Sequence, residues 1–99
     1  MMESRFETML DQLEEELEGA EEYTKCAMAT KAEMPDVGSM YMRMADQEME
    51  HANNLHHAID KLVRGEHVPH DLQVVWEWQN GKYMRWAEKI RMKMEMVRR

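Results

Sequence analysis

Two residues of the kinds that bind divalent metals, Glu48 and His51, lie three positions apart in the segment EMEHANNLHHAI. On a helix this spacing places both side chains on the same side, one turn apart. They belong to a stripe that we expect such a helix to bury, which consists of Tyr41, Met44, Glu48, His51, Leu55, Ala58 and Leu62. Burying a carboxylate and an imidazole without partners costs several kcal/mol. The pair therefore needs either a metal ion or polar groups of the protein.

A further carboxylate, Glu16, borders the apolar stripe of the preceding segment, and Tyr23 follows it two turns later. That stripe consists of Phe6, Met9 or Leu10, Leu13, Leu17, Ala20, Thr24 and Ala27. The short connection around Pro35 makes the two segments antiparallel neighbours, so we expect Glu16 to approach Glu48 and His51 across the hairpin. Carboxylates and a neutral imidazole are natural ligands of divalent metal ions.

The set of ligands in one chain is only half of a di-metal site. Helix bundles hold two irons or two manganeses with two units, each made of a Glu and a Glu-x-x-His. This chain has one such unit, because neither Glu77 nor Glu88 is followed by a histidine three residues later. A two-fold axis uses the same surface twice. The sequence therefore predicts a site built between two chains, or else no di-metal site.

The segments ELEGAEEY (16–23) and DQEMEHA (46–52) resemble motifs of the ferritin-like superfamily, and most closely those of the encapsulated ferritins. The resemblance covers about residues 6–64. It implies a four-helix bundle formed by dimerisation, with a di-iron centre shared between two chains and manganese as the alternative metal. It also implies that Glu16, Glu48 and His51 are metal ligands and that Tyr23 hydrogen-bonds near the centre. Glu18 would be an outer site that guides incoming ions.

The activity that this resemblance implies is that of a ferroxidase, which oxidises Fe(II) to Fe(III) with O₂ or peroxide. A peroxide-reducing or manganese site would use the same ligands. A non-enzymatic helical assembly or adaptor protein with a structural Glu/His network is the alternative from another class. The expected partner is a second copy, in a homodimer or a higher ring of dimers.

The sequence departs from the encapsulated ferritins in two places, and the second bears on capture by an encapsulin-type shell. Glu22 stands where the family has an aromatic residue, and the segment from Glu88 to Arg99 shows no docking peptide. The hairpin chemistry is therefore better supported by the sequence than is enclosure in a shell.

The rest of the sequence favours a single all-α domain over residues 1–99. Breaks at 34–38 (MPDVG) and 65–70 (GEHVPH) separate three helical segments, 3–33, 36–64 and 70–97, and Gly81 is expected to break or kink the third. The first two form an antiparallel hairpin and the third is a C-terminal helix. Histidines near the breaks, His67 and His70, are expected to be loop residues.

The composition restricts the class of function. The net charge of -7 gives no basic surface for nucleic acid, and the chain has neither a long apolar run for a membrane nor a signal-peptide pattern. We therefore expect a cytoplasmic or otherwise intracellular protein. One cysteine, Cys26, excludes an intramolecular disulfide framework.

Several other side chains have a structural interpretation. We expect the 13 methionines to fill the core and interfaces, with a soft-metal site or a sink for oxidants as alternatives. His56 and His57 are expected at the solvent edge of the stripe. Trp76, Trp78 and Trp86 are expected to anchor the core and interfaces.

Overall fold

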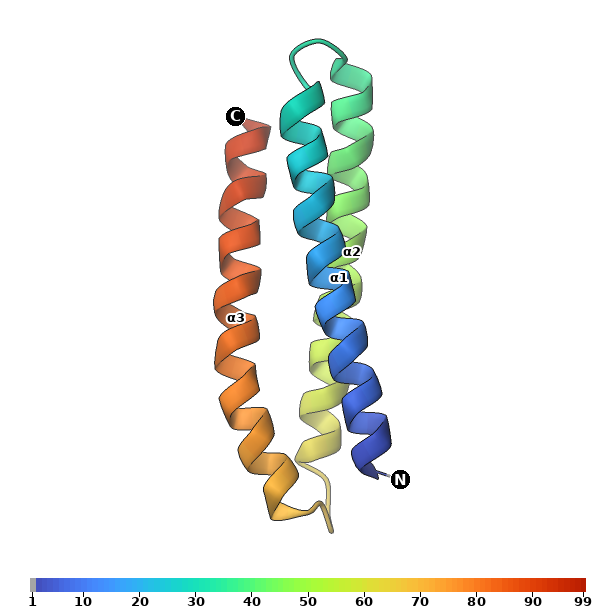
Figure 1. Cartoon of the computed structure of the whole chain (residues 1–99), viewed down its shortest axis with the longest axis vertical. Helices are drawn as coiled ribbons and strands as arrows, with labels where there is room; N and C mark the ends of the chain where they lie inside the picture. Colours follow the sequence, from blue (N-terminus) through green and yellow to red (C-terminus); the bar gives the residue numbers. More distant parts are fainter. Residues whose placement is uncertain (1) are drawn as a thin grey trace.

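The computed structural model describes residues 2–99 as three long helices joined by short connections (Figure 1). Helix α1 spans Met2–Thr30, α2 spans Pro35–Val63 and α3 spans His70–Arg98. No strand occurs within residues 2–99, which confirms the all-α prediction. In the same range, no helix has the combination of length and apolar character that crossing a bilayer requires.

The helix ends follow the local chemistry of the chain. Pro35 occupies the first turn of α2, where its missing N–H needs no partner, and Pro69 directly precedes α3. His67, in the connection between α2 and α3, has a positive φ of 62°. The bounds lie within three residues of the predicted segments, except that α3 continues unbroken through Gly81. The interruption expected there is absent, because α3 buries side chains on both sides of the glycine, including Trp76 and Tyr83.

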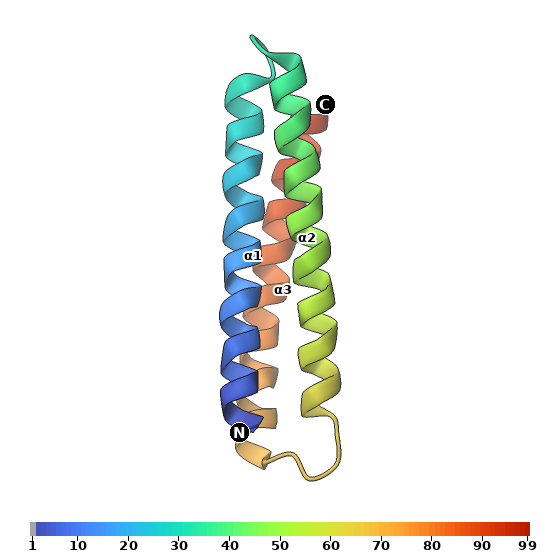
Figure 2. The ribbon, with the colours of Figure 1, turned by 90° about the vertical axis from the view of Figure 1, so that its right-hand side faces the viewer.

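Helices α1 and α2 form the antiparallel hairpin and lie side by side along its whole length (Figure 2). The buried side of α1 is the predicted one, since it consists of Phe6, Leu13, Leu17, Ala20, Thr24 and Ala27. The buried side of α2 consists of Gly38, Ala45, Ala52, Ile59 and Val63. The first four of these recur every seven residues and three of the four are small, which lets the two helix backbones approach closely.

Within one chain, the hairpin therefore closes on a different side of α2 from the predicted stripe. His51 and Ala58 are exposed, and the other members of that stripe are only half-buried. The larger apolar side chains of α2 carry most of its hydrophobic signal in the sequence, whereas the hairpin closes on the small ones. At Gly38, an added Cβ would lie 2.9 Å from the Cα of Lys31 in the facing backbone, which shows how little space the contact leaves.

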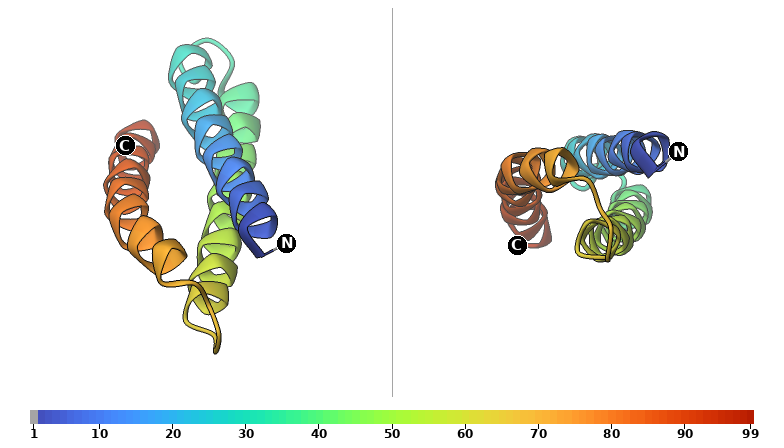
Figure 3. Two further views of the ribbon diagram at one scale, coloured as in Figure 1. Left: turned by 60° about the horizontal axis from the view of Figure 1, so that its bottom comes forward. Right: turned by 90° about the horizontal axis from the view of Figure 1, so that it is seen from below.

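Helix α3 packs along one side of the hairpin, so that the three helices lie at the corners of a triangle when viewed along their axes (Figure 3). Its buried residues are Leu72, Trp76, Tyr83, Ile90, Met94 and Val97. Polar contacts accompany them: Tyr83 donates to Glu14, Lys93 pairs with Glu21, and Arg98 pairs with Asp46. Burial, followed by the hydrogen bond to Glu14, raises the pKa of Tyr83 far above its ordinary value.

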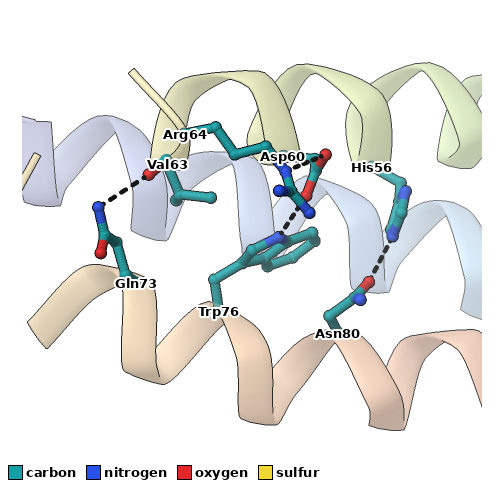
Figure 4. A network of polar contacts seen from close by, with 7 residues as sticks. All are labelled: His56, Asp60, Val63, Arg64, Gln73, Trp76 and Asn80. Atoms are coloured by element: carbon teal, nitrogen blue, oxygen red, sulfur yellow. Dashed lines mark hydrogen bonds and ion pairs between the residues drawn. The ribbon is translucent and has the colours of Figure 1, made fainter. Parts of the chain in front are cut away.

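A polar network joins α2 to the first half of α3 (Figure 4). The indole N–H of Trp76 donates to Asp60 at 3.1 Å, and Arg64 donates to the same carboxylate at 2.9 Å. These two bonds lower the pKa of Asp60. His56 contacts Asn80 and the Trp76 ring, so it faces α3 rather than lying at a solvent edge as expected. His57 is exposed.

The tryptophans differ in their surroundings. Trp76 belongs to the core and Trp86 is half-buried, in agreement with their predicted role as anchors. Trp78 is 73% exposed, so it anchors no core within this chain.

The position of the α1–α2 seam can be tested with a pair of substitutions on α2. We expect Ala45→Leu to lower the free energy of unfolding by about 1–3 kcal/mol, because the seam has no room for a larger side chain. The matched change Ala58→Leu, at an exposed position, should change it by less than about 0.5 kcal/mol. Urea denaturation followed by circular dichroism measures both. If Ala58→Leu lowered the free energy of unfolding more than Ala45→Leu, the side of α2 predicted from the sequence would be the one that faces α1.

Candidate metal centre

Three side chains that can bind a metal meet across the hairpin. Glu16 of α1 and Glu48 and His51 of α2 each offer one ligand atom, and these atoms lie within 4.8 Å of one another. Nδ1 of His51 lies 3.4 Å from Oε2 of Glu16. Within residues 2–99 this is the one group of three or more His, Cys, Asp or Glu side chains with such proximity. The approach expected from the sequence is therefore found, while the role of these residues as ligands stays a prediction.

The group lies on the side of the hairpin that faces away from α3. Two residues turn a helix by about 200°, so Glu16 points away from the direction of Glu14, which bonds to Tyr83 of α3. The same relation separates Glu48 from Asp46, the partner of Arg98. Side-chain exposure of 26% for Glu16 and 57% for His51 leaves the cluster accessible from this side.

Gly19 makes room for the cluster and was missed by the sequence analysis. A Cβ added at Gly19 would lie 2.8 Å from Oε2 of Glu48, so the bare backbone of α1 provides the space in which this carboxylate rests. The signal in the sequence was a lone glycine inside a strongly helical segment, ELEGAEE, where it lowers helix stability.

The electrostatics of the cluster disfavour two bare carboxylates. A hydrogen bond with Glu16, then burial, then repulsion by the Glu16 charge raise the pKa of Glu48 to about 7, although the nearby His51 opposes this. A proton shared between the two carboxylates relieves the repulsion near neutral pH. A bound cation would relieve it as well and would replace the proton.

The remaining predicted site residues lie outside this group. Tyr23 is half-buried and stacks on Tyr41, with ring centroids 6.2 Å apart and planes inclined by 24°. Its predicted hydrogen bond near the centre stays a prediction. Glu18 is exposed and takes no part in the three-residue group. Its proposed role in guiding ions stays a prediction.

The sequence matches the family model described as Rubrerythrin over residues 7–97, which is nearly the whole chain. The chain belongs to the rubrerythrin family. The predicted membership of the ferritin-like superfamily is thereby confirmed, whereas the narrower resemblance to encapsulated ferritins stays a prediction. Comparisons with curated proteins and with solved structures found no match.

Rubrerythrin-family domains are often di-iron oxidoreductases, and the donor set of this member fits that chemistry. Carboxylate oxygens and an imidazole nitrogen suit iron and manganese, and all three atoms converge from two adjacent helices. The ligand atoms of the two carboxylates lie within 4.8 Å of each other, and a cation or a proton between them would relieve their repulsion. Glu16, Glu48 and His51 would therefore hold the metal.

The raised pKa of Glu48 predicts how the stability of the metal-free protein depends on pH. The pKa in the folded state, about 7, lies above the ordinary value of 4.5, so protonated Glu48 favours the folded state. This contribution is complete below the ordinary value and is lost as the pH rises through about 7. We therefore expect the free energy of unfolding, measured by urea denaturation, to fall between about pH 5 and pH 8. Glu48→Gln should make this fall smaller.

The exposed neighbour Glu50 provides the matched control, because it lies on the same helix outside the three-residue group. Glu50→Gln should keep the pH dependence of the wild type. If the free energy of unfolding changed equally with pH in the wild type and in Glu48→Gln, the assignment of a shared proton would be contradicted.

Proposed function

We propose that this rubrerythrin-family protein is a ferroxidase, which oxidises Fe(II) to Fe(III) at a di-iron centre shared between two chains. The observation that carries the proposal is the convergence of Glu16, Glu48 and His51 within 4.8 Å. Membership of a family rich in di-iron oxidoreductases supports it.

The number of ligands favours a second copy as the partner. One chain supplies one Glu and one Glu-x-x-His, which is half of the set that helix bundles use for two irons. The flank that carries the cluster also has half-buried apolar residues, namely Tyr41, Met44, Leu55 and Leu62. A two-fold axis through this flank would cover them and would bring two half-sites together in a four-helix bundle.

The residues of the chain have distinct roles in this proposal. Two copies bring four carboxylates, from Glu16 and Glu48, whose charge balances two divalent ions and favours the oxidised pair. Neutral His51 provides a nitrogen donor, and Glu48 must release its proton when metal binds. The stacked rings of Tyr23 and Tyr41 lie on the same flank. When bound, the two irons supply the electrons that reduce O₂ or peroxide.

Iron binding under anaerobic conditions tests the proposal directly. We expect about two Fe(II) per pair of chains, and rapid oxidation once O₂ is admitted. Glu48→Ala should lower the initial oxidation rate at least about tenfold, since even the partners of metal ligands commonly contribute that much. Stopped-flow absorbance and elemental analysis provide the measurements.

Glu50→Ala is the control, because this exposed residue lies next to the cluster without belonging to it. Its rate should equal that of the wild type. Purified protein that binds no Fe(II) would favour a non-enzymatic assembly or adaptor protein. Binding of manganese with peroxide reduction, without Fe(II) oxidation, would favour the peroxide-reducing alternative on the same ligands.

The shared site predicts that association depends on the flank that carries the cluster. With Fe(II) under argon, sedimentation velocity should give a species of twice the chain mass of 11.9 kDa, or a multiple of that pair. Leu55→Glu places a charge on this flank and should produce single chains. Trp78→Glu removes an exposed aromatic residue from α3 and should leave the pair intact. A metal-loaded single chain would contradict the proposal.

A further inference from the structure

The methionines of this protein lie mostly outside its core. Residues 2–99 contain 12 of them, and only Met94 is buried, at 3% exposure. Six are exposed by 39% to 60%: Met28, Met34, Met40, Met84, Met92 and Met96. The remaining five are half-buried. The expectation that methionine fills the core holds for Met94, and Met2, Met9, Met42 and Met49 pack against the core from its edge. The six exposed methionines take no part in the core of this chain, although methionine is one of the residue types most often buried in proteins. Their predicted place in interfaces stays a prediction.

Helix formation does not explain this choice of residue. Leucine and methionine have nearly equal helix propensities and similar volumes, and the core of this protein uses leucine, isoleucine and alanine. An exposed methionine differs from leucine chiefly in its thioether sulfur, which binds soft metals and reacts with peroxide. The surface positions therefore point to sulfur chemistry.

The positions of the exposed sulfurs distinguish between metal binding and reaction with peroxide. A soft-metal site needs several thioethers that converge on one point. Here Met34 and Met40 flank the α1–α2 connection, while Met84 and Met92 lie on α3 two turns apart. Oxidation takes place at one sulfur at a time and needs exposure only. The scattered positions of the exposed methionines therefore suit oxidation by peroxide and do not suit a soft-metal site.

We propose that the exposed methionines form a sink for hydrogen peroxide that protects the interior of the protein. In each event one oxygen atom passes from H₂O₂ to a thioether sulfur, the sulfur is oxidised to the sulfoxide, and the peroxide is reduced to water. Sulfoxide reductases return the thioether, so the sink is renewable.

Two features of the structure suit this role. Met28 and Met96 line a shallow apolar groove between α1 and α3, where an added sulfoxide oxygen reaches water without disturbing the core. Met94 is two residues from both Met92 and Met96 in the chain and lies in the core that α3 shares with the hairpin, where a polar sulfoxide would disrupt packing. Two exposed sulfurs of the sink, those of Met92 and Met96, thus flank in the chain the one buried methionine, whose oxidation would disturb the core.

Peroxide is the two-electron reduction product of O₂, so oxidation of two Fe(II) would generate it on the same protein. That source rests on the proposed function. The test below uses added peroxide and metal-free protein, so its outcome does not depend on iron chemistry.

The experiment compares two proteins in a Cys26→Ser background, because a free thiol would also consume peroxide. One keeps all methionines, and the other has leucine at the six exposed positions. Both receive ¹⁸O-labelled H₂O₂ at a dose below the number of exposed methionines, and peptide mapping by mass spectrometry locates the label. In the first protein we expect sulfoxide at the exposed positions and little at Met94. In the second, the labelled fraction of Met94 should rise about twofold or more.

A matched control carries leucine at three half-buried positions, Met42, Met44 and Met49, and keeps the six exposed sulfurs. Its Met94 should stay as protected as in the first protein. Equal oxidation of Met94 with and without the exposed methionines would overturn the proposal.

The oxidised protein must also remain folded. After labelling of the exposed positions, we expect the thermal midpoint to shift by less than about 4 °C, and methionine sulfoxide reductases to restore the original mass. Unfolding that accompanies oxidation of the exposed methionines alone would show damage rather than a sink and would equally overturn the proposal.

Discussion

The close contact between α1 and α2 is the constraint on which the rest of the structure depends. Small residues on α2, namely Gly38, Ala45 and Ala52, face the buried side of α1 and hold the two backbones near each other. At this separation Glu16 can meet Glu48 and His51 across the seam. Larger side chains in the seam would separate the helices and would move the carboxylates apart.

This contact also concentrates like charge. The two glutamates disfavour each other without a proton or a cation, which the raised pKa of Glu48 shows. Gly19 lowers stability in the same place a second time, because glycine weakens the helix that carries Glu16. The hairpin thus gives up stability at one place, as proteins commonly do at functional sites, and recovers it through the apolar contacts along the remainder of the seam.

Much of this arrangement follows from the sequence, and the failures have physical causes. Phe6, Leu13 and Leu17 mark the buried side of α1 because large apolar residues recur there at helical spacing. On α2 the alanines carry little hydrophobic signal, and their importance comes from helix separation, which only the folded hairpin defines. The continuity of α3 through Gly81 likewise depends on packing against the hairpin rather than on local propensity.

The site itself was predictable as far as its three side chains, since Glu-x-x-His and a facing Glu have a recognisable spacing. One Glu-x-x-His per chain has a further consequence for a centre built on a two-fold axis. The two metal positions would be equivalent by symmetry, with identical ligands and equal reduction potentials before any substrate arrives. Any distinction between them would have to come from the oxidant, and one substitution in the gene would alter both positions at once.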